Sequence, residues 1–244
     1  MTVTEITQSP KTPFEAATFD LYRDIHKGIR GELFGVTQLA GRLDSSDHLA
    51  RVALVEQVHS AVELLVSHAE HEDRSVQPAI ELHLPDLAEQ ISSDHERLEA
   101  RLEDLDAMAI DLVGAPATTR RSAVHRLYVE LASFTSAYLA HQDLEEREVM
   151  PSLEAAIGLE AVMAIHADIL AGIPPQEMAA SLAVMLPAMN IDDRAEMLGG
   201  MQASAPAEVF AGVWALAGSV LPAADHAALA DRLGLVPVVA GPHY

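Results

Sequence analysis

Apolar residues recur every three or four positions through four long segments of the chain, which is the spacing of helices that bury one face. The segments cover roughly residues 13–43, 46–84, 91–112 and the stretch that follows Pro116. A short polar break at Asp44–Ser46 separates the first two segments, and Gly114–Pro116 separates the last two. The pattern therefore predicts four long helices, and such short breaks favour antiparallel neighbours.

The pattern changes after Pro151, where charged residues become sparse and Ala and Met become frequent. Pro and Gly at 172–175 and Pro187 interrupt this region, because neither residue suits the interior of a helix. We expect five helices of about 10 to 15 residues, near 159–171, 175–186, 191–203, 206–220 and 223–233. They form a smaller helical C-terminal extension over residues 158–244.

The extension carries more apolar side chains than one short helix can bury. They are Met185, Leu186, Met189, Met197, Met201, Phe210, Val213, Trp214, Leu216 and Ala217. The first interpretation is a small helical domain, either autonomous or packed on the preceding helices. The alternatives are a homodimer interface or a lid over a pocket, because Met-rich surfaces adapt to partners.

Composition narrows the classes of partner. The formal net charge of −22 repels phosphate backbones, so we expect no nucleic acid. Cysteine is absent, which excludes disulfides and thiolate ligands. No stretch approaches the roughly 18 consecutive apolar residues of a membrane helix. Residues 1–13 are polar, lack the regions of a signal peptide and are expected to be flexible. We therefore expect a cytoplasmic protein without membrane partners.

Four histidines stand four residues before a glutamate. The pairs are His59/Glu63, His68/Glu72, His95/Glu99 and His141/Glu145. A separation of four is about one helical turn, so each pair projects an imidazole and a carboxylate from one side of its helix. These are donor types that bind iron, zinc or manganese.

A ligand inside a bundle must lie on the apolar face of its helix. His59 points about 180° away from His68 at 100° per residue, and we interpret it with Glu63 as a solvated surface pair. The other three pairs fall on or beside the apolar face of their helices, with Glu99 beside His95. His26 lies among apolar residues of the first segment. Burying several polar side chains at one height along the bundle costs free energy unless they have partners, and a metal centre would supply those partners.

The positions of the histidines relative to the two turns bear on the number of metals. His26 and His68 lie about 19 and 23 residues from the first turn, and His95 and His141 about 20 and 25 from the second. Each pair is therefore mismatched by about five residues, on the order of 8 Å at 1.5 Å per residue. Two metals bridged by carboxylates can span that separation.

These motifs resemble the hemerythrin-like, or HHE cation-binding, domains over about residues 14–157. The matching motifs are His26 in HKGIR, His68 to Glu72 in HAEHEDRSVQP, His95 to Glu99 in HERLE and His141 to Glu145 in HQDLEEREVMP. The resemblance implies an all-α, antiparallel up-down four-helix bundle, an architecture that includes myohemerythrin. It also implies a non-haem diiron centre with two Fe per chain. Glu72 and Glu145 would bridge the two irons, and the histidines would be terminal ligands.

Two positions differ from the oxygen-carrying hemerythrins. Those carriers have a histidine where Glu99 stands, and an aspartate five residues after the histidine that corresponds to His141. This chain has Glu146 there and Glu145 one place earlier, and we assign Glu145 with Glu146 as the alternative. Glu99 as a ligand adds an anionic donor, which favours Fe(III) and disfavours a reversible carrier.

The resemblance and this ligand set lead to three hypotheses about function. The first is a diiron protein that binds or reacts with O2, peroxide or nitric oxide. The second is a diiron oxygenase or oxidase acting on a small organic substrate. The third is an iron- or redox-sensing module that engages a protein partner. No catalytic residue is assigned, and if the protein is an enzyme we expect a diiron oxidoreductase.

Three other residues deserve a prediction. His71 is expected at the surface, with support or replacement of Glu72 as the alternative. His166 lies in an apolar run and is expected to pack. Tyr22, one turn before His26, is expected in the core, with gating of a bound oxygen species as the alternative.

Overall fold

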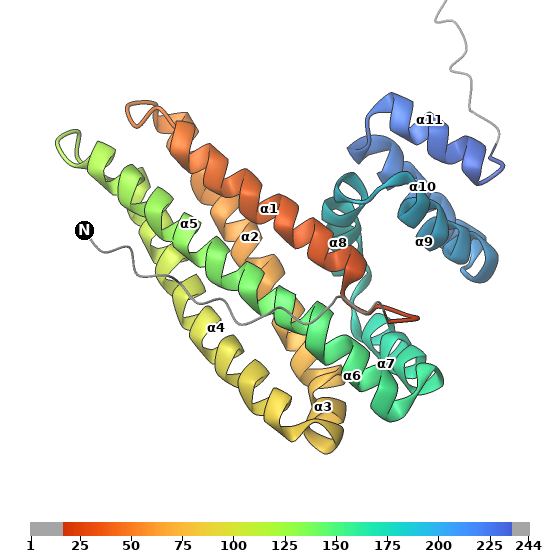
Figure 1. Cartoon of the computed structure of the whole chain (residues 1–244). Coiled ribbons are helices and arrows are strands. Elements are labelled where there is room, and N and C mark those ends of the chain that lie inside the picture. The colour runs from red at the N-terminus through yellow and green to blue at the C-terminus, as the bar shows by residue number, and fades with distance from the viewer. Residues whose placement is uncertain (1–16, 236–244) are drawn as a thin grey trace, which may run out of the picture.

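The computed structural model describes residues 17–235 and contains no strand within them (Figure 1). The predicted flexible segment 1–13, the start of the first predicted helix and the last residues of the predicted extension lie outside the described residues. The elements are α1 Arg23–Arg42, α2 His48–Ser75, α3 Gln77–His83, α4 Pro85–Val113, α5 Arg120–Leu144, η1 Glu145–Val149, α6 Met150–Ile157, α7 Leu159–Gly172, α8 Pro175–Ala188, α9 Ile191–Ser204, α10 Ala207–Val220 and α11 Ala223–Arg232.

Four long helices, α1, α2, α4 and α5, form the predicted antiparallel bundle. Each packs against two others, in the cyclic order α1, α2, α4, α5 (Figure 1). Their inward faces carry aliphatic and aromatic residues at helical spacing, as in α5 with Leu127, Leu131, Phe134 and Tyr138. The all-α up-down four-helix fold is therefore confirmed.

The first helix begins at Arg23, and the prediction of a start near residue 13 is wrong for residues 17–22. The Asp20 carboxylate accepts hydrogen bonds from the backbone amides of Tyr22 and Arg23. The backbone amides of Thr18 and Phe19 donate hydrogen bonds to the Glu154 carboxylate. Side chains that bind backbone amides compete with the helical hydrogen bonds, so this stretch remains irregular.

The fourth long helix is interrupted by a π-helix that the sequence analysis did not predict. In η1 the Met150 amide donates to the Glu145 carbonyl, five residues earlier. This widened turn shifts the helical register, and both Val149 and Met150 are fully buried. Single-turn π-helices of this kind occur frequently at functional sites.

The extension consists of the five predicted helices, each within two residues of its expected bounds. Helix α7 packs on one end of the bundle, where Val162 is buried with Tyr22 and Met150. Helices α8 to α11 share a separate apolar core, and α8 packs against α1 (Figure 1). At Gly28 an added Cβ would lie 3.3 Å from the Met185 backbone, so glycine permits α8 to approach α1 closely.

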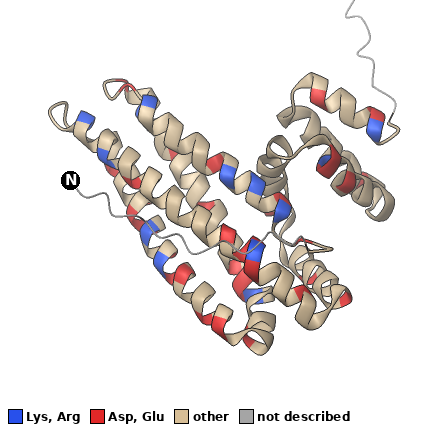
Figure 2. Cartoon of the chain, viewed as in Figure 1, with Lys and Arg blue, Asp and Glu red and all other residues tan. Residues whose placement is uncertain are grey.

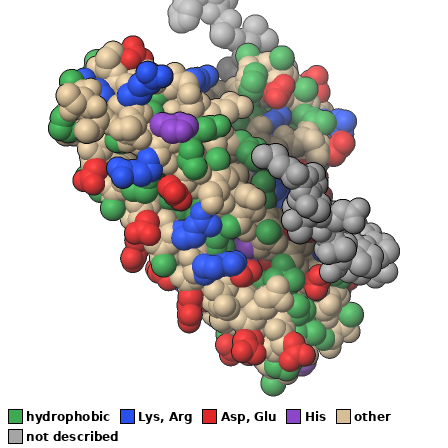
Figure 3. Space-filling view, turned by 60° about the vertical axis from the view of Figure 1, so that its left-hand side comes forward, with side chains coloured by type: hydrophobic (Ala, Val, Ile, Leu, Met, Phe, Trp, Pro, Cys, Tyr) green, Lys and Arg blue, Asp and Glu red, His purple; other side chains and the backbone are tan. Residues whose placement is uncertain are grey.

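Ion pairs also join the extension to α1. Lys27 and Arg23 pair with Asp193, and Arg23 pairs with Glu196, 3.2 Å away. Figure 2 shows acidic residues along α4 and basic residues on α1 near the extension. On the face shown in Figure 3, charged side chains of both signs alternate with small groups of hydrophobic ones.

Within residues 17–235, no single helix is long and apolar enough to cross a membrane. The pair Arg120–Ile157 and Leu159–Gly172 passes the length and composition test only together, and it bends by 115°.

Candidate metal centre

Six titratable side chains from the four bundle helices meet inside the protein. They are His26 from α1, His68 and Glu72 from α2, His95 from α4, His141 from α5 and Glu145 at the start of η1. All six are buried. Glu72 lies near the end of α2, which α3 follows, and Glu145 begins η1, which α6 follows, so the cluster lies toward the end of the bundle where α3 and α6 pack.

The Glu72 carboxylate lies between two histidines. Its Oε1 lies 3.1 Å from His68 Nε2, and its Oε2 lies 3.4 Å from His95 Nε2. The two oxygens of one side chain therefore face imidazoles from different helices, α2 and α4.

Glu145 has the same arrangement on the opposite side. Its Oε1 lies 3.1 Å from His141 Nε2, and its Oε2 lies 3.4 Å from His26 Nε2. His26 Nε2 also lies 3.3 Å from His68 Nε2. The four Nε2 atoms thus converge on the two carboxylates.

This donor set fits metal ions. The four oxygens of Glu72 and Glu145 are buried and have no hydrogen-bond partner, and neither does His95 Nε2. Leaving such groups unsatisfied costs free energy, which a bound cation would offset. The candidate ligand atoms form two groups that share Glu72, and within each group all ligand atoms lie within 4.8 Å of one another. The groups are Glu72, His95, His141 and Glu145, and His26, His68 and Glu72.

Carboxylates also face the outer nitrogens of three of the histidines. Glu146 Oε1 lies 3.0 Å from His26 Nδ1, and Asp73 Oδ1 lies 2.8 Å from His95 Nδ1. Asp94 Oδ2 lies 3.6 Å from His141 Nδ1. At His26 and His95 the carboxylate is within hydrogen-bond distance and holds the Nδ1 proton, so the Nε2 lone pair remains for a metal.

The electrostatic environments of the histidines differ. Burial lowers the pKa of His68 to about 4, despite the nearby Glu72 carboxylate. Burial also acts to lower the pKa of His95, but the hydrogen bond to Asp73 and the nearby Glu72 carboxylate outweigh it and raise the pKa to about 10. Burial opposes charge at His141 as well, yet Glu145 raises its pKa. Negative charge is therefore concentrated around His95 and His141.

Burial would raise the pKa of both Glu145 and Glu146, but their partners lower it. For Glu145 the partner is first of all His141, so its pKa falls below the ordinary value. For Glu146, hydrogen bonds from His26 and Arg30 lower the pKa to about 2. Both side chains therefore stay ionised.

Two tyrosines border the centre. The Tyr22 ring stacks on His26 with 5.0 Å between ring centroids, and the Tyr138 ring lies 5.8 Å from that of His141. Burial raises the pKa of both phenols well above the ordinary value, and the Glu72 and Glu145 carboxylates raise it further. Both tyrosines remain neutral and help to exclude water. The predicted core position of Tyr22 is confirmed.

The structure does not bring Glu99 to the centre. Its side chain is exposed and belongs to neither group of ligand atoms. The buried residues of α4 run from Ile91 to His95, then to Leu98 and Leu102. The step after His95 is three residues, so Leu98 takes the inward position and Glu99 turns to solvent. Glu99 therefore leaves the proposed ligand set.

The remaining predicted residues lie as follows. The His59/Glu63 pair is exposed, with 3.4 Å between Nε2 and Oε1, which confirms the surface prediction. His71 is partly buried and contacts Glu177 of α8 at 2.5 Å, so it joins α2 to the extension. His166 packs edge-on against Phe19, as predicted for a packing residue.

Sequence reasoning did not identify Asp73 and Asp94 as partners of the histidines. Each adjoins a ligand candidate in the sequence, Asp73 following Glu72 and Asp94 preceding His95. Adjacency alone carries little information, because neighbouring residues on a helix point 100° apart and the contact depends on how α2, α4 and α5 pack.

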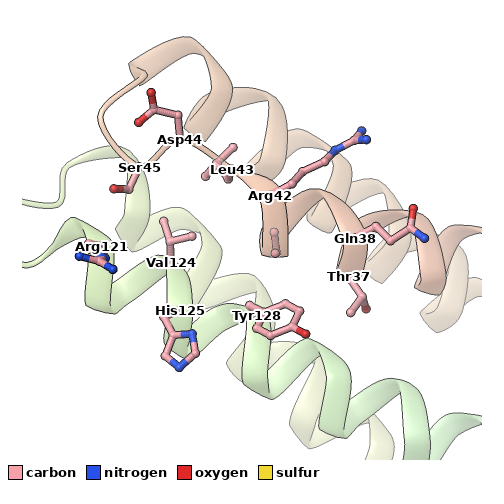
Figure 4. Close-up of a pocket in the computed structure, with 12 residues that line it drawn as sticks. Thr37, Gln38, Arg42, Leu43, Asp44, Ser45, Arg121, Val124, His125 and Tyr128 are labelled. Carbon is pink, nitrogen blue, oxygen red and sulfur yellow. The ribbon is translucent and has the colours of Figure 1, made fainter.

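A cavity of about 790 Å³ opens at the other end of the bundle, between the C-terminal end of α1 and the N-terminal end of α5. Figure 4 shows Tyr128, His125 and Arg121 of α5 on one side and Thr37 and Arg42 of α1 on the other. None of the six cluster residues lines this cavity. It is therefore separate from the candidate metal centre.

Comparison with known proteins gives one match. A family model described as the hemerythrin HHE cation binding domain matches residues 17–153, which is more than half of the chain and includes all six cluster residues. No curated protein and no solved structure matches.

Proposed function

Since the chain belongs to the hemerythrin HHE cation binding domain family, we propose that its buried cluster holds two iron ions and binds or reacts with O2, peroxide or nitric oxide. The observation that carries this proposal is the position of the two carboxylates. Each carboxylate places one oxygen toward a histidine of the His26/His68 pair and the other oxygen toward a histidine of the His95/His141 pair.

This arrangement supports two cation positions. One lies among His26, His68 and oxygens of Glu72 and Glu145. The other lies among His95, His141 and the remaining oxygens of the same carboxylates. Both glutamates would then bridge, as the resemblance implied.

The donor types favour iron over harder and softer ions. Imidazole nitrogens with carboxylate oxygens suit iron, manganese and zinc, whereas Mg²⁺ and Ca²⁺ prefer oxygen alone and Cu(I) prefers sulfur. When bound, iron would supply the redox chemistry and the coordination positions that O2, peroxide or nitric oxide require. The chain's own contribution is to orient the imidazoles and to surround the site with Tyr22, Tyr138 and aliphatic side chains.

The exposed position of Glu99 changes the expected redox preference. With four histidines and two carboxylates, the centre lacks the third anionic ligand that was expected to favour Fe(III). The argument against reversible binding therefore loses its basis, and the proposal includes binding as well as consumption of small ligands.

A second candidate function, an iron- or redox-sensing module, is favoured by the position of the extension. Helix α8 packs on α1 at Gly28, two residues after His26, and Glu177 of α8 contacts His71, next to Glu72. A shift of α1 or α2 on metal binding would therefore reach α8. A sensor requires such a change to differ between redox states.

The test is anaerobic reconstitution with Fe(II), followed by elemental analysis and by optical spectra on exposure to O2, peroxide and nitric oxide. We expect about two iron atoms per chain and a spectral change with at least one of these ligands. His59→Ala is the matched control, since it removes an exposed histidine with the same spacing to a glutamate. One tightly bound zinc with no affinity for iron would overturn the proposal.

A further inference from the structure

The carboxylates that face the Nδ1 atoms are distributed unequally between the two cation positions. At the position between His95 and His141, Asp73 lies at hydrogen-bond distance from His95 Nδ1, 2.8 Å, and Asp94 lies farther from His141 Nδ1, at 3.6 Å, where it contributes charge and not a hydrogen bond. At the position between His26 and His68, only His26 has such a carboxylate, Glu146 at 3.0 Å. Within residues 17–235, no carboxylate contacts His68 Nδ1.

The charges of these carboxylates are also offset unequally. Arg30 donates two hydrogen bonds to Glu146, at 2.8 and 3.0 Å, so this pair carries no net formal charge. In the described part of the chain, Asp73 pairs with no lysine or arginine. Asp94 pairs with Arg97, whose side chain is mostly exposed and therefore strongly solvated. The surroundings of His95 and His141 thus carry one more negative formal charge than those of His26 and His68.

The number of converging ligands differs in the same direction. Around His95 and His141, four residues bring ligand atoms within 4.8 Å of one another, whereas three do so around His26 and His68. Preorganised ligands bind a cation more tightly, because less free energy is spent on arranging them.

We propose that Asp73 and Glu146 are positioning residues and that Asp94 adds negative charge beside His141, which makes the two cation positions unequal, so that the position between His95 and His141 fills first. This inference rests on the proposed two-metal site and adds the residues that set its order of filling. Asp73 and Glu146 lie within hydrogen-bond distance of the Nδ1 atoms of His95 and His26, so each holds that proton, aims Nε2 at the cation and increases the basicity of the ring. The extra negative charge at Asp73 and Asp94 adds Coulomb attraction for the first cation.

The order of filling can be measured on the full chain without any assay of activity. Metal-free protein is titrated with Co(II) by calorimetry, and the optical absorption of bound Co(II) is recorded at each step. We expect two steps, the first tighter. His141→Ala should remove the tighter step, and His68→Ala should remove the weaker one.

The positioning residues are tested with amide variants of nearly equal size. Asp73→Asn should weaken the first step by roughly 10- to 100-fold and leave the second within a few-fold, the usual range for carboxylates that support metal-bound histidines. Glu146→Gln should weaken the second step instead. Asp106→Asn is the matched control, because Asp106 contacts the exposed His59 Nδ1 at 3.1 Å outside the centre, and it should change neither step.

The outcomes separate the two proposals. Wild-type protein that binds fewer than two Co(II) ions under saturating conditions overturns the two-metal site itself. Two bound ions whose affinities do not respond to Asp73→Asn, or respond equally in both steps, overturn only the inference about positioning. Circular dichroism of the metal-free variants shows whether each is folded. If carboxylate charge is the cause, Asp73→Glu should retain part of the Co(II) affinity that Asp73→Asn loses in the first step.

Discussion

Glu145 and Glu146 are adjacent in the chain, yet they contact opposite nitrogens of the same imidazole. Glu145 lies 3.4 Å from His26 Nε2, and Glu146 lies 3.0 Å from His26 Nδ1. The first glutamate faces the centre of the cluster, and the second lies outside the ring with Arg30. Adjacent carboxylates therefore have different roles, one as a candidate ligand and one as the support of a ligand.

The first prediction separates these two roles. Glu145→Ala removes two ligand oxygens, so the protein should hold clearly fewer than two iron atoms per chain even after reconstitution with excess Fe(II). Glu146→Ala removes no ligand atom and should still reach about two under the same conditions, although with lower affinity. Iron analysis after removal of unbound metal measures the difference. Equal losses in the two variants would show that the contacts to His26 do not distinguish the residues.

The second prediction concerns Glu99. Because its side chain is exposed, Glu99→Gln should leave iron content unchanged and should alter the free energy of unfolding by less than about 0.5 kcal/mol. Chemical denaturation and iron analysis measure both quantities, with Glu72→Gln as the buried comparison. Loss of iron from Glu99→Gln would show that α4 rotates to bring this side chain inward when metal binds.

The orientation of Glu99 could have been predicted from the sequence by a closer reading of the helical register. The buried positions advance in alternating steps of three and four. In α2 the step from Leu65 to His68 is three, so the next step, of four, reaches Glu72. In α4 the step from Ile91 to His95 is already four, so the next, of three, reaches Leu98. A glutamate four residues after a buried histidine therefore faces inward only when the step that leads to the histidine is three.

The position of the π-helix could not be predicted from the sequence in this way, although Pro151 is a local signal for it. Proline donates no amide hydrogen bond, and its ring clashes with the carbonyl four residues earlier. A wider turn just before Pro151 relieves this conflict inside a helix that continues to Ile157. Proline can also kink or end a helix, and which of these occurs depends on the packing of Glu145, Val149 and Met150. That packing is a property of the assembled bundle.

The third prediction is that bound metal stabilises the fold. Metal binding to the native state adds roughly 2.7 kcal/mol when free metal exceeds its Kd about 100-fold. For a chain of this size that corresponds to a rise in Tm of about 5–10 °C. Chelation should lower the Tm of the wild type and of His59→Ala by similar amounts. The Tm of Glu72→Ala, which lacks the carboxylate shared by both ligand groups, should respond much less.

The fourth prediction concerns the boundary between the bundle and the extension. Val162 of α7 is buried against Tyr22 and Met150, so α7 completes the end of the bundle near the metal centre. A chain shortened to end at Gly172 should stay soluble and retain its iron. A chain shortened to end at Ile157 exposes that apolar surface and should unfold at lower temperature or aggregate. Equal Tm and equal iron content in the two would favour the boundary predicted from the sequence, after Ile157.

The fifth prediction tests the contact between α1 and α8 through a pair of glycines in one helix. A Cβ at Gly28 would lie 3.1 Å from the Val184 Cγ1 and 3.3 Å from the Met185 backbone, whereas a Cβ at Gly35 would meet no atom within 4 Å. Gly28→Val should therefore cost about 1–3 kcal/mol through overpacking, because the backbone of α8 cannot yield as a side chain can. Gly35→Val has the same effect on helix propensity without the clash, so its change should stay near or below about 0.5 kcal/mol. Thermal unfolding of both variants measures the difference. Because Gly28 lies two residues after His26, iron content should also be recorded. A loss of iron in Gly28→Val alone would show that docking of α8 helps to hold His26 in place. Equal stability of the two variants would instead show that α8 moves freely away from α1.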